Sequence, residues 1–428
     1  MEGLFAERLR RFPLWRPLND RDFRLLFVGQ SVSLFGDQFY LVALTWLTLQ
    51  LTGSGFALGT VLMVGGGARA VFELVGGALS DRLSLRAILL ISNVVRAIVS
   101  ALITTVVLLG LARLWHLIVL SLVFGLVDAF FQPAFLAFIP RLIDKDQLTA
   151  GNALMRGTNR LMGMLGPAAA GLVLYSVGLT VAFALDTVTF VFAAVTVWLM
   201  GERKLPPSPE SGSEREAEPA GLKGLLASIS DGLKYAWRDP IIRTLLVFVT
   251  AVEFSFVGAA GVGLAVLANN RFGGGGATSE GGVAFATILS ALGAGALIGM
   301  IVAGSIEPPK RRGKLVVALS FMLGTGLVLL GFAPNVATAS IVFGLVGMGG
   351  GMANIIILAW MQSRTDPHML GRVMAVVMFT VSVIEPLSLA LAGLIADFNV
   401  TLVFVVAGAI VLATGALSLT SRTMRTSD

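Results

Sequence analysis

The sequence predicts an all-α membrane protein of twelve transmembrane helices, arranged as two similar bundles of six. Three observations lead to this prediction. The chain is 56% hydrophobic and only 13% charged, it contains twelve long apolar stretches, and its basic residues gather on alternate loops. A water-soluble chain of 428 residues would need more charge to cover its surface, so the lipid bilayer is the expected solvent.

Each predicted span reaches the ~20 apolar residues that cross the hydrocarbon core of a bilayer. The first six are 23–51, 55–79, 87–111, 115–139, 149–174 and 180–200. The second six are 241–268, 282–305, 314–332, 336–361, 370–394 and 400–420. The predicted domains are a leader at 1–22, bundles at 23–200 and 241–420, a linker at 201–240 and a tail at 421–428.

The linker has two parts of different composition. Its first part is rich in Pro, Ser, Glu and Gly, which predicts disorder. Its second part carries apolar residues at helical spacing together with lysine and arginine, which predicts an amphipathic helix on the cytoplasmic leaflet.

The basic residues predict that both termini lie in the cytoplasm. With the amino terminus inside, the external loops contain only Arg113 and Arg271 of the chain's 31 Lys and Arg residues. Cytoplasmic loops of membrane proteins carry this excess of positive charge. We therefore expect a multi-pass protein of the inner (plasma) membrane, and we read residues 1–22 as a leader and not as a cleaved signal peptide.

The two halves resemble each other in sequence. The string FGLV occurs at 124–127 and again at 343–346, and Pro167 maps onto Pro386 at the same offset of 219 residues. Asp22 and Asp239 also precede equivalent spans, at an offset of 217. Repeated halves are typical of transporters that rock two bundles about a site at the bilayer midplane.

Several classes of function are disfavoured. The chain has no cysteine and only two histidines far apart, so no metal site, disulfide or cofactor is expected. The net charge of +6 follows membrane topology, so no nucleic-acid partner is expected. An intramembrane protease, the main enzyme alternative, would need paired aspartate motifs that are missing, and no Walker or hydrolase motif occurs.

The loop between the second and third predicted spans reads GGALSDRLSLR, from residue 76 to residue 86. We call it the gating motif, with Gly77, Asp81, Arg82 and Arg86 as its main residues. Asp81 can face the positive end of another helix while the arginines pair with acids on the partner bundle. This stretch resembles the signature of major facilitator transporters, although Ser and Leu replace a later Gly and basic residue.

The fifth predicted span contains MGMLGPAAAG, from residue 162 to residue 171. A Gly-Pro pair bends an apolar helix, and the small residues around it allow a second helix to approach. Gly166, Pro167 and Gly171 resemble the antiporter signature of drug:proton exporters, with two of its glycines replaced. We group them with Pro386 as the kink motif; a packing kink without a directional role is the alternative interpretation.

Longer stretches at 19–54 and 129–174 resemble the twelve-span exporters that include enterobactin and macrolide efflux proteins. This resemblance implies the major facilitator fold, in which spans 1, 4, 7 and 10 line the cavity. It also implies export of an amphipathic small molecule driven by protons, and a monomer in the bilayer is expected. One departure concerns coupling: Ser121 stands where many drug exporters carry an arginine in the fourth span.

Charged residues inside predicted spans are functional candidates, because a charge at the bilayer centre costs at least about 2.5 kcal/mol. Asp37, Asp128 and Glu253 fall on spans 1, 4 and 7, which the resemblance identifies as cavity-lining. A buried carboxylate there can bind and release a proton as the cavity changes side. We expect these three residues to act in coupling or in substrate contact.

Arg156 and Arg160 lie near the cytoplasmic end of the fifth span, and five other charges lie deeper in the membrane. Arg69 and Glu73 are four residues apart on one helix face, so we expect them to pair, as a structural pair or a gate. Glu385, next to the kink motif, is a second candidate proton carrier. Arg96 and Asp186 lie on spans expected to be scaffold, and we expect structural roles for them.

The transported compound stays open at this level. A drug, macrolide or siderophore-like compound fits the resemblance, and lipid or lysophospholipid transport on the same fold is the main alternative. Sugar or amino-acid uptake is disfavoured because the chain has only three tyrosines to supply polar contacts.

The topology is testable because single cysteines can be placed freely in a chain that has none. We expect an impermeant thiol reagent, applied outside the cell, to label cysteines at positions 53, 178 and 335 and to miss those at 84, 212 and 311. Labelling at 84 or 311 from outside would contradict the twelve-span arrangement with both termini inside.

Overall fold

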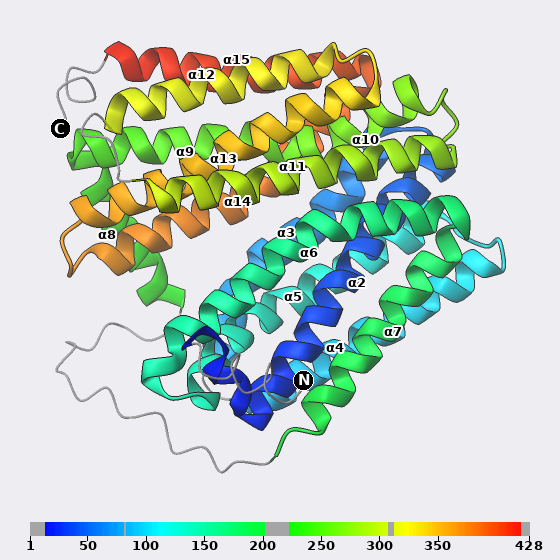
Figure 1. Cartoon of the computed structure of the whole chain (residues 1–428), viewed down its shortest axis with the longest axis horizontal. Coiled ribbons are helices and arrows are strands. Elements are labelled where there is room, and N and C mark those ends of the chain that lie inside the picture. Colours follow the sequence, from blue (N-terminus) through cyan, green and yellow to red (C-terminus); the bar gives the residue numbers. More distant parts are fainter. Residues whose placement is uncertain (1–12, 81–82, 202–221, 307–311, 421–428) are drawn as a thin grey trace, which may run out of the picture.

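The computed structural model describes residues 13–80, 83–201, 222–306 and 312–420, and within them the chain is helical without strands. Two helix bundles lie side by side (Figure 1). The amino-terminal bundle contains α2 (Arg21–Thr52), α3 (Gly55–Ser80), α4 (Leu85–Leu108), α5 (Leu114–Leu142), α6 (Leu148–Ser176) and α7 (Leu179–Trp198). The carboxy-terminal bundle contains α9 (Pro240–Gly258), α11 (Ser279–Ser305), α12 (Arg312–Gly331), α13 (Val336–Arg364), α14 (Leu370–Phe398) and α15 (Val400–Thr420).

These helices match the predicted spans one for one. In the described residues, 11 helices are long and apolar enough to cross a membrane. The remaining one, α6, has 29 residues, as many as α5, but its first half is more polar. The seventh span continues beyond α9 through a π-helical segment η3 (Ala259–Gly263), a short α10 (Leu264–Leu267) and a second π-helical segment η4 (Ala268–Phe272). The prediction of an all-α membrane fold is confirmed.

The two halves begin with the same helix cap. Asp20 caps α2 by accepting hydrogen bonds from the backbone N–H groups of Asp22 and Phe23 at 2.9 and 3.1 Å. Asp239 caps α9 in the same way, with Pro240 at the first helical position. Asp20 and Asp239 are 219 residues apart, the offset of the other repeats. The expected equivalence of Asp22 with Asp239 is therefore wrong by two residues, because Asp22 lies inside α2 and Asp20 is its cap.

The apolar cores show where the bundles join. One core contains residues of both bundles, including Leu44, Phe183, Leu264 and Phe343. We call the end of the molecule at which α2 ends and α3 begins the closed end. At the other end, the linker end, where α7 ends and α9 begins, each bundle has a separate core of its own. The molecule is therefore held together by shared packing at the closed end and divided at the linker end.

Two helix pairs form the seam between bundles, α3 with α14 and α6 with α11. Small residues allow this close approach: a Cβ at Gly59 would lie 2.6 Å from the carbonyl oxygen of Leu389, and one at Gly293 would lie 2.7 Å from that of Gly163. At the linker end of the second seam, Gly157 and Gly304 face open space. The α6–α11 seam therefore opens toward the linker end, in agreement with the separate cores.

A carboxylate of one bundle caps a helix of the other at the closed end. Asp397, near the end of α14, accepts hydrogen bonds from the backbone N–H groups of Gly55 and Phe56 at 2.5 and 3.2 Å. It also accepts one from the hydroxyl of Ser54 at 2.7 Å. These groups form the start of α3, whose free N–H groups and helix dipole favour a negative charge. Asp397 therefore links the bundles only while the closed end stays closed.

A second polar link lies at the same end. Trp46 of α2 donates its indole N–H to the carbonyl oxygen of Ala277 at 2.9 Å, and Gln50 donates to the same oxygen at 3.2 Å. Ala277 belongs to the loop before α11, where its φ of 51° is held by a 2.7 Å hydrogen bond from its own N–H to Asn269. The amino-terminal bundle thus grips a constrained loop of its partner.

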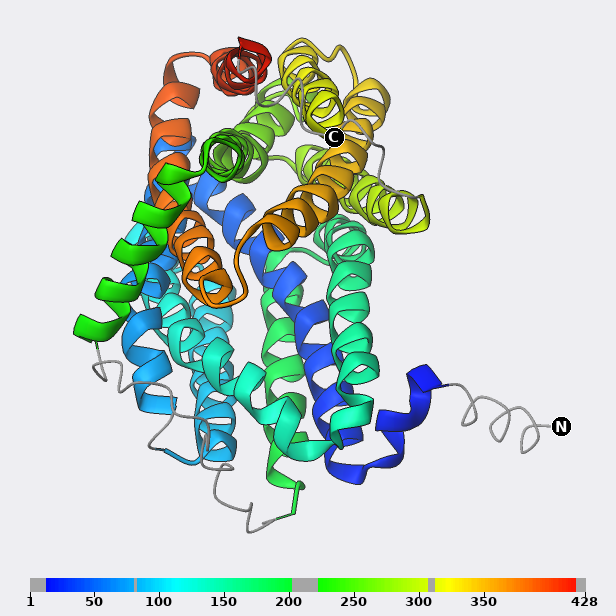
Figure 2. The same cartoon turned by 90° about the vertical axis from the view of Figure 1, so that its left-hand side faces the viewer.

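The predicted linker helix is present as α8 (Leu222–Arg238) and belongs to the carboxy-terminal bundle (Figure 2). Tyr235 donates its hydroxyl to Asp366 at 3.0 Å, and Asp239 pairs with Arg364 at 3.1 Å. Leu233 and Trp237 of this helix remain exposed. The helix is therefore attached to α14 and to the loop before it.

The cap across the bundles generates a test. Replacing Asp397 with Ala should raise the reaction rate of a cysteine placed at buried Val266, beside Gly55, with an impermeant maleimide. The expected increase is roughly five-fold, since loss of an N-cap side chain costs about 1 kcal/mol. Asp397→Asn should give a smaller increase, because its amide keeps one of the two acceptor oxygens but loses the negative charge. A labelling rate in Asp397→Ala equal to that without the substitution would show that Asp397 does not hold the closed end.

Candidate functional site

Charged side chains meet halfway along the helices. In seven helices, an ionisable residue lies within one turn of the midpoint, and five of these residues line the same cavity. These five residues are Asp37, Arg69, Arg96, Asp128 and Glu385. The middle of the bundle is where an unpaired charge is least tolerated, so the arrangement is expected to neutralise charge or to serve a function.

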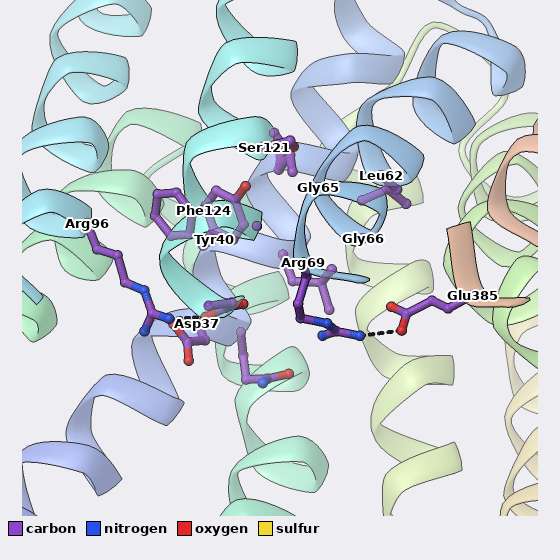
Figure 3. A pocket seen from close by; sticks show the side chains of 15 residues that line it. Asp37, Tyr40, Leu62, Gly65, Gly66, Arg69, Arg96, Ser121, Phe124 and Glu385 are labelled. Atoms are coloured by element: carbon purple, nitrogen blue, oxygen red, sulfur yellow. Dashed lines mark hydrogen bonds and ion pairs between the residues drawn. The ribbon is translucent and has the colours of Figure 1, made fainter. Parts of the chain in front are cut away.

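All five side chains line a single pocket of about 290 Å³ between α2, α3, α4, α5 and α14 (Figure 3). Every lining residue comes from the amino-terminal bundle except Glu385, which α14 contributes from across the seam. The glycines of the wall matter for its shape: a Cβ at Gly125 of α5 would overlap the carbonyl oxygen of Gly65 of α3. Close contact of these two helices brings Arg69 and Asp128 to the same cavity.

Arg96 of α4 forms an ion pair with Asp128 of α5. The Arg96 side chain is only 4% exposed, and its guanidinium lies over the ring of Phe131 at 4.6 Å from the centroid. Asp186 of α7 lies in the same buried region and accepts a hydrogen bond from Ser100 at 2.8 Å. The Asp186 carboxylate has a second oxygen without a partner among the described residues, so this polar cluster is only partly satisfied.

Arg69 of α3 forms an ion pair with Glu385 of α14, which joins the two bundles inside the pocket (Figure 3). The expected pairing of Arg69 with Glu73 is therefore wrong. Glu73 instead accepts a hydrogen bond from Ser382 of α14 at 3.2 Å. Both side chains of α3 turn toward α14 because that helix packs directly on them. The spacing along one helix predicted a pair between Arg69 and Glu73. In the structure, both residues bond to side chains of α14 instead.

Asp37 of α2 is the pocket carboxylate that carries no hydrogen bond or ion pair within the described part of the chain. It points into the cavity next to Arg96 (Figure 3). Beside it, Tyr40 stacks on Phe124, with ring centroids 4.3 Å apart and planes 4° from parallel. Each of the two ion pairs is neutral by itself. Asp37 therefore gives the pocket a net negative charge next to an aromatic surface.

Other predicted site residues lie outside this pocket. Glu253 is half-buried on α9, where it interacts electrostatically with Glu385 and Arg160, but it does not line the cavity. In the gating motif, Gly77 lies in the last part of α3, whose side chains are not described. Asp81 and Arg82 lie outside the described residues. Arg86 donates to the carbonyl oxygens of Val197 and Trp198 and so joins α4 to the end of α7.

The kink motif lies in both seams. Gly166 of α6 packs on Gln38, a pocket residue, and Gly171 packs on Ala286 of α11. Pro167 is buried in α6, which runs without a break from Leu148 to Ser176. Pro386 of α14 packs on Gly66 of α3, next to the Arg69–Glu385 pair. The motif therefore brings the seam helices to the pocket.

Arg96 is the pocket residue that sequence reasoning missed. We expected a scaffold role because α4 is the third span, but its long side chain reaches past the helix surface to Asp128. Ser121 also lines the pocket, so Arg96 supplies a guanidinium near the position where related exporters carry one in the fourth span. The depth of Arg96 in an apolar span was the available signal. Among the described residues, no group of three or more His, Cys, Asp and Glu side chains is arranged for a metal.

Comparison with known sequences finds one matching family model and several similar proteins. A family model described as Major Facilitator Superfamily matches residues 26–388. The chain is 25% identical to macrolide efflux protein A of Streptococcus pyogenes over 386 residues, covering 88% of this chain and 89% of the relative. It is also 25% identical to the multidrug efflux pump Tap of Mycolicibacterium fortuitum, with 85% and 86% covered. The enterobactin exporter EntS of Shigella boydii is 25% identical, with 82% and 79% covered.

Solved structures share the fold. A bacterial homologue of the human lysosomal transporter Spinster, in an inward-facing and unoccupied conformation, superposes with a TM-score of 0.68. It is 12% identical and covers 93% of this chain and 97% of its own. The POT family transporter PepTSo superposes with a TM-score of 0.67 at 13% identity, covering 96% and 99%.

The exposure of the two ion pairs predicts different costs for breaking them. Arg96→Gln should lower the free energy of unfolding by about 3 kcal/mol, because the Arg96 side chain is only 4% exposed and its loss leaves Asp128, itself 35% exposed, without its partner. Arg69→Gln should cost about 1 kcal/mol, because Arg69 and Glu385 are 35% and 26% exposed and water or a cosolute can replace the partner.

Thermal unfolding of the purified protein, followed by tryptophan fluorescence, measures both effects. The double variant Arg96→Gln/Asp128→Asn should recover most of the loss, because it removes both charges together. A larger shift for Arg69→Gln than for Arg96→Gln would contradict this ranking of the pairs.

Proposed function

Because the chain belongs to the Major Facilitator Superfamily, we propose that it is a secondary active transporter that exports an amphipathic small molecule in exchange for protons. The family places the chain among transporters and not among enzymes. The curated relatives named as macrolide, multidrug and enterobactin exporters support a drug, macrolide or siderophore-like substrate. The observation that carries the proposal is the charged pocket at mid-depth between two bundles that share a core at one end only.

The unequal ends support transport by alternating access. Apolar packing, the Asp397 cap and the Trp46 hydrogen bond close one end. At the linker end, the bundles have separate cores, so they can part without losing a shared core. We propose that the bundles rock about the pocket and that packing at the linker end replaces packing at the closed end.

The direction of transport follows from the proposed topology. If the linker end is cytoplasmic, as the basic residues predict, the pocket of this structure is reached from the cytoplasm and sealed from outside. The compound then binds from the inside, which is the direction export requires. The proposed domain boundaries keep the bundles at 23–200 and 241–420, with the linker and both termini inside and a monomer as the working unit.

Asp37 is the proposed site of exchange. Its carboxylate is exposed to the pocket and is not held by a partner, whereas Asp128 and Glu385 are each paired with an arginine. A proton taken up when the pocket faces the acidic outside neutralises Asp37. Release of that proton toward the cytoplasm restores the negative charge, and the aromatic surface of Tyr40 and Phe124 can then receive a compound with a positive group.

The test of coupling uses purified protein in liposomes, with each variant assayed in two modes. We expect Asp37→Asn to lose efflux driven by a pH gradient while keeping gradient-free exchange of the same compound, because only the proton cycle needs the charge. Asp128→Asn and Glu253→Gln are the matched controls and should retain gradient-driven efflux, although at a reduced rate.

Other outcomes would redirect the proposal. If all three variants keep gradient-driven efflux, the proton carrier is another group, with Glu385 and Glu73 the next candidates. If the wild-type protein ignores the pH gradient while moving lysophospholipid, antiport is contradicted and lipid transport takes its place. Screening dyes, macrolides, siderophores and lysophospholipids in the same liposomes identifies the compound.

A further inference from the structure

The seventh span loses its regular hydrogen bonding where Ser388 of α14 meets it. In an unbroken helix, the N–H of Gly258 would donate to the carbonyl oxygen of Phe254, four residues earlier. Here the Gly258 N–H donates to the Ser388 hydroxyl at 2.9 Å, and that hydroxyl donates to the Phe254 oxygen. The Ser388 hydroxyl therefore bridges a donor and an acceptor of α9 that are regular helical partners.

The break in α9 follows at once. The regular helix ends at Gly258, and the next five residues form the π-helical segment η3, whose wider turn is seen in the hydrogen bond from Leu264 N–H to the Ala259 oxygen. A side chain inserted into the ladder is a known cause of helix bends, and short π-segments recur at functional positions. Gly258 allows the approach, because a Cβ there would lie 2.6 Å from the Ser388 carbonyl oxygen.

The segment beyond this break closes the molecule. We call residues 259–272 the tip of the seventh span. Leu264, Ala265 and Leu267 of the tip are completely buried, and they share one core with α2 and α3 of the opposite bundle. Val266 contacts the start of α3 beside Gly55. The tip thus fills the closed end, and its direction depends on the geometry at Gly258.

We propose that the Ser388 hydroxyl is a positioning residue that forms a hinge in the seventh span and directs the tip into the closed end. The inference rests on the proposed alternation of the two ends. With the hydroxyl inserted, the tip bends into the shared core. Without it, the Gly258 N–H and the Phe254 oxygen can bond to each other, the span straightens, and the tip fits the shared core less well.

Two features make this exchange physically available. The backbone groups freed by loss of the hydroxyl are each other's regular helical partners, so no buried group is left unsatisfied. A cavity of about 180 Å³ lies against the hinge, lined by Ser255, Gly258, Ser388 and apolar residues of α14 and α15. It provides space into which the span can move. Ser255 also lines it, and its hydroxyl has no partner within the described residues.

The experiment compares Ser388→Ala with Ser255→Ala and Ser388→Thr. Ser255 is a matched control, since it is a buried serine of α9 that lines the same cavity as Ser388, but its hydroxyl is not bonded to the backbone. Threonine keeps the hydroxyl and restores the hinge, with the cavity to receive its methyl group. Thermal unfolding first confirms that each purified variant is folded.

Pulsed electron resonance then measures two distances between nitroxide pairs placed on introduced cysteines. Phe56→Cys with Asn270→Cys spans the closed end, and Leu83→Cys with Gln362→Cys spans the linker end; all four native side chains are exposed. We expect Ser388→Ala to enrich the long closed-end distance roughly five-fold, the effect of a net loss of one hydrogen bond. The linker-end distance should shorten in the same fraction of molecules, which a local packing defect would not cause.

For a compound that the wild type exports, turnover should fall in Ser388→Ala while KM stays unchanged, because the hinge lies outside the pocket. The inference is overturned if Ser388→Ala matches Ser255→Ala in both distances, or if Ser388→Thr behaves like Ser388→Ala. The distances need no transported compound. A hinge effect without any export would therefore contradict the proposed function alone, and export with unchanged distances would contradict the hinge alone.

Discussion

The requirement that charges at mid-bilayer depth find partners organises this molecule. Hydrocarbon offers no water to solvate a charge, so each ionisable side chain has to face a cavity or another charge. Arg96 is joined to Asp128 within one bundle, and Arg69 is joined to Glu385 between bundles. These pairs join four helices around one pocket. The same requirement leaves Asp37 in the cavity, where a proton or a positive group can neutralise it.

Close helix packing makes these pairs possible. Lipid does not drive helices together as water does, so small residues and polar contacts determine which helices touch. Glycines of α3, α5 and α9 bring backbones into contact at the seam and around the pocket. One helix, α14, performs three tasks between residues 385 and 397: Glu385 enters the pocket, Ser388 bonds to the backbone of α9, and Asp397 caps α3. Motion of α14 would therefore change contacts at the pocket and at the closed end together.

The two ends differ in how their contacts can be broken. The closed end combines a shared apolar core with a few directional hydrogen bonds, such as those of Asp397 and Trp46. Such bonds are lost in one step when the helices part, which favours two discrete arrangements over gradual loosening. The linker end already has self-contained cores in each bundle. The protein can therefore open and close about the pocket without unfolding either bundle.

The sequence by itself determined the features that depend on local composition. The positions of the spans follow from apolar length against bilayer thickness, and the division into halves follows from the repeat offset. The presence of charges at mid-depth could also be predicted from the sequence. Which charged side chains pair with each other could not. Arg69 bonds to Glu385, 316 residues away, and not to nearby Glu73, because the rotation of α3 against α14 decides which side chains meet.

Three other features also depend on how the helices pack: the position of Arg96, the cap of α2 and the break in the seventh span. Arg96 entered the pocket because α4 lies against α5 at the depth of Asp128, which no spacing along either helix reveals. Asp20, and not Asp22, took the cap because the chain turns into the helix at that residue. The break in the seventh span has no local cause in proline; it comes from a serine on α14. Sequence periodicity sets each helix in the membrane, and only packing between helices sets which of its faces meets which neighbour.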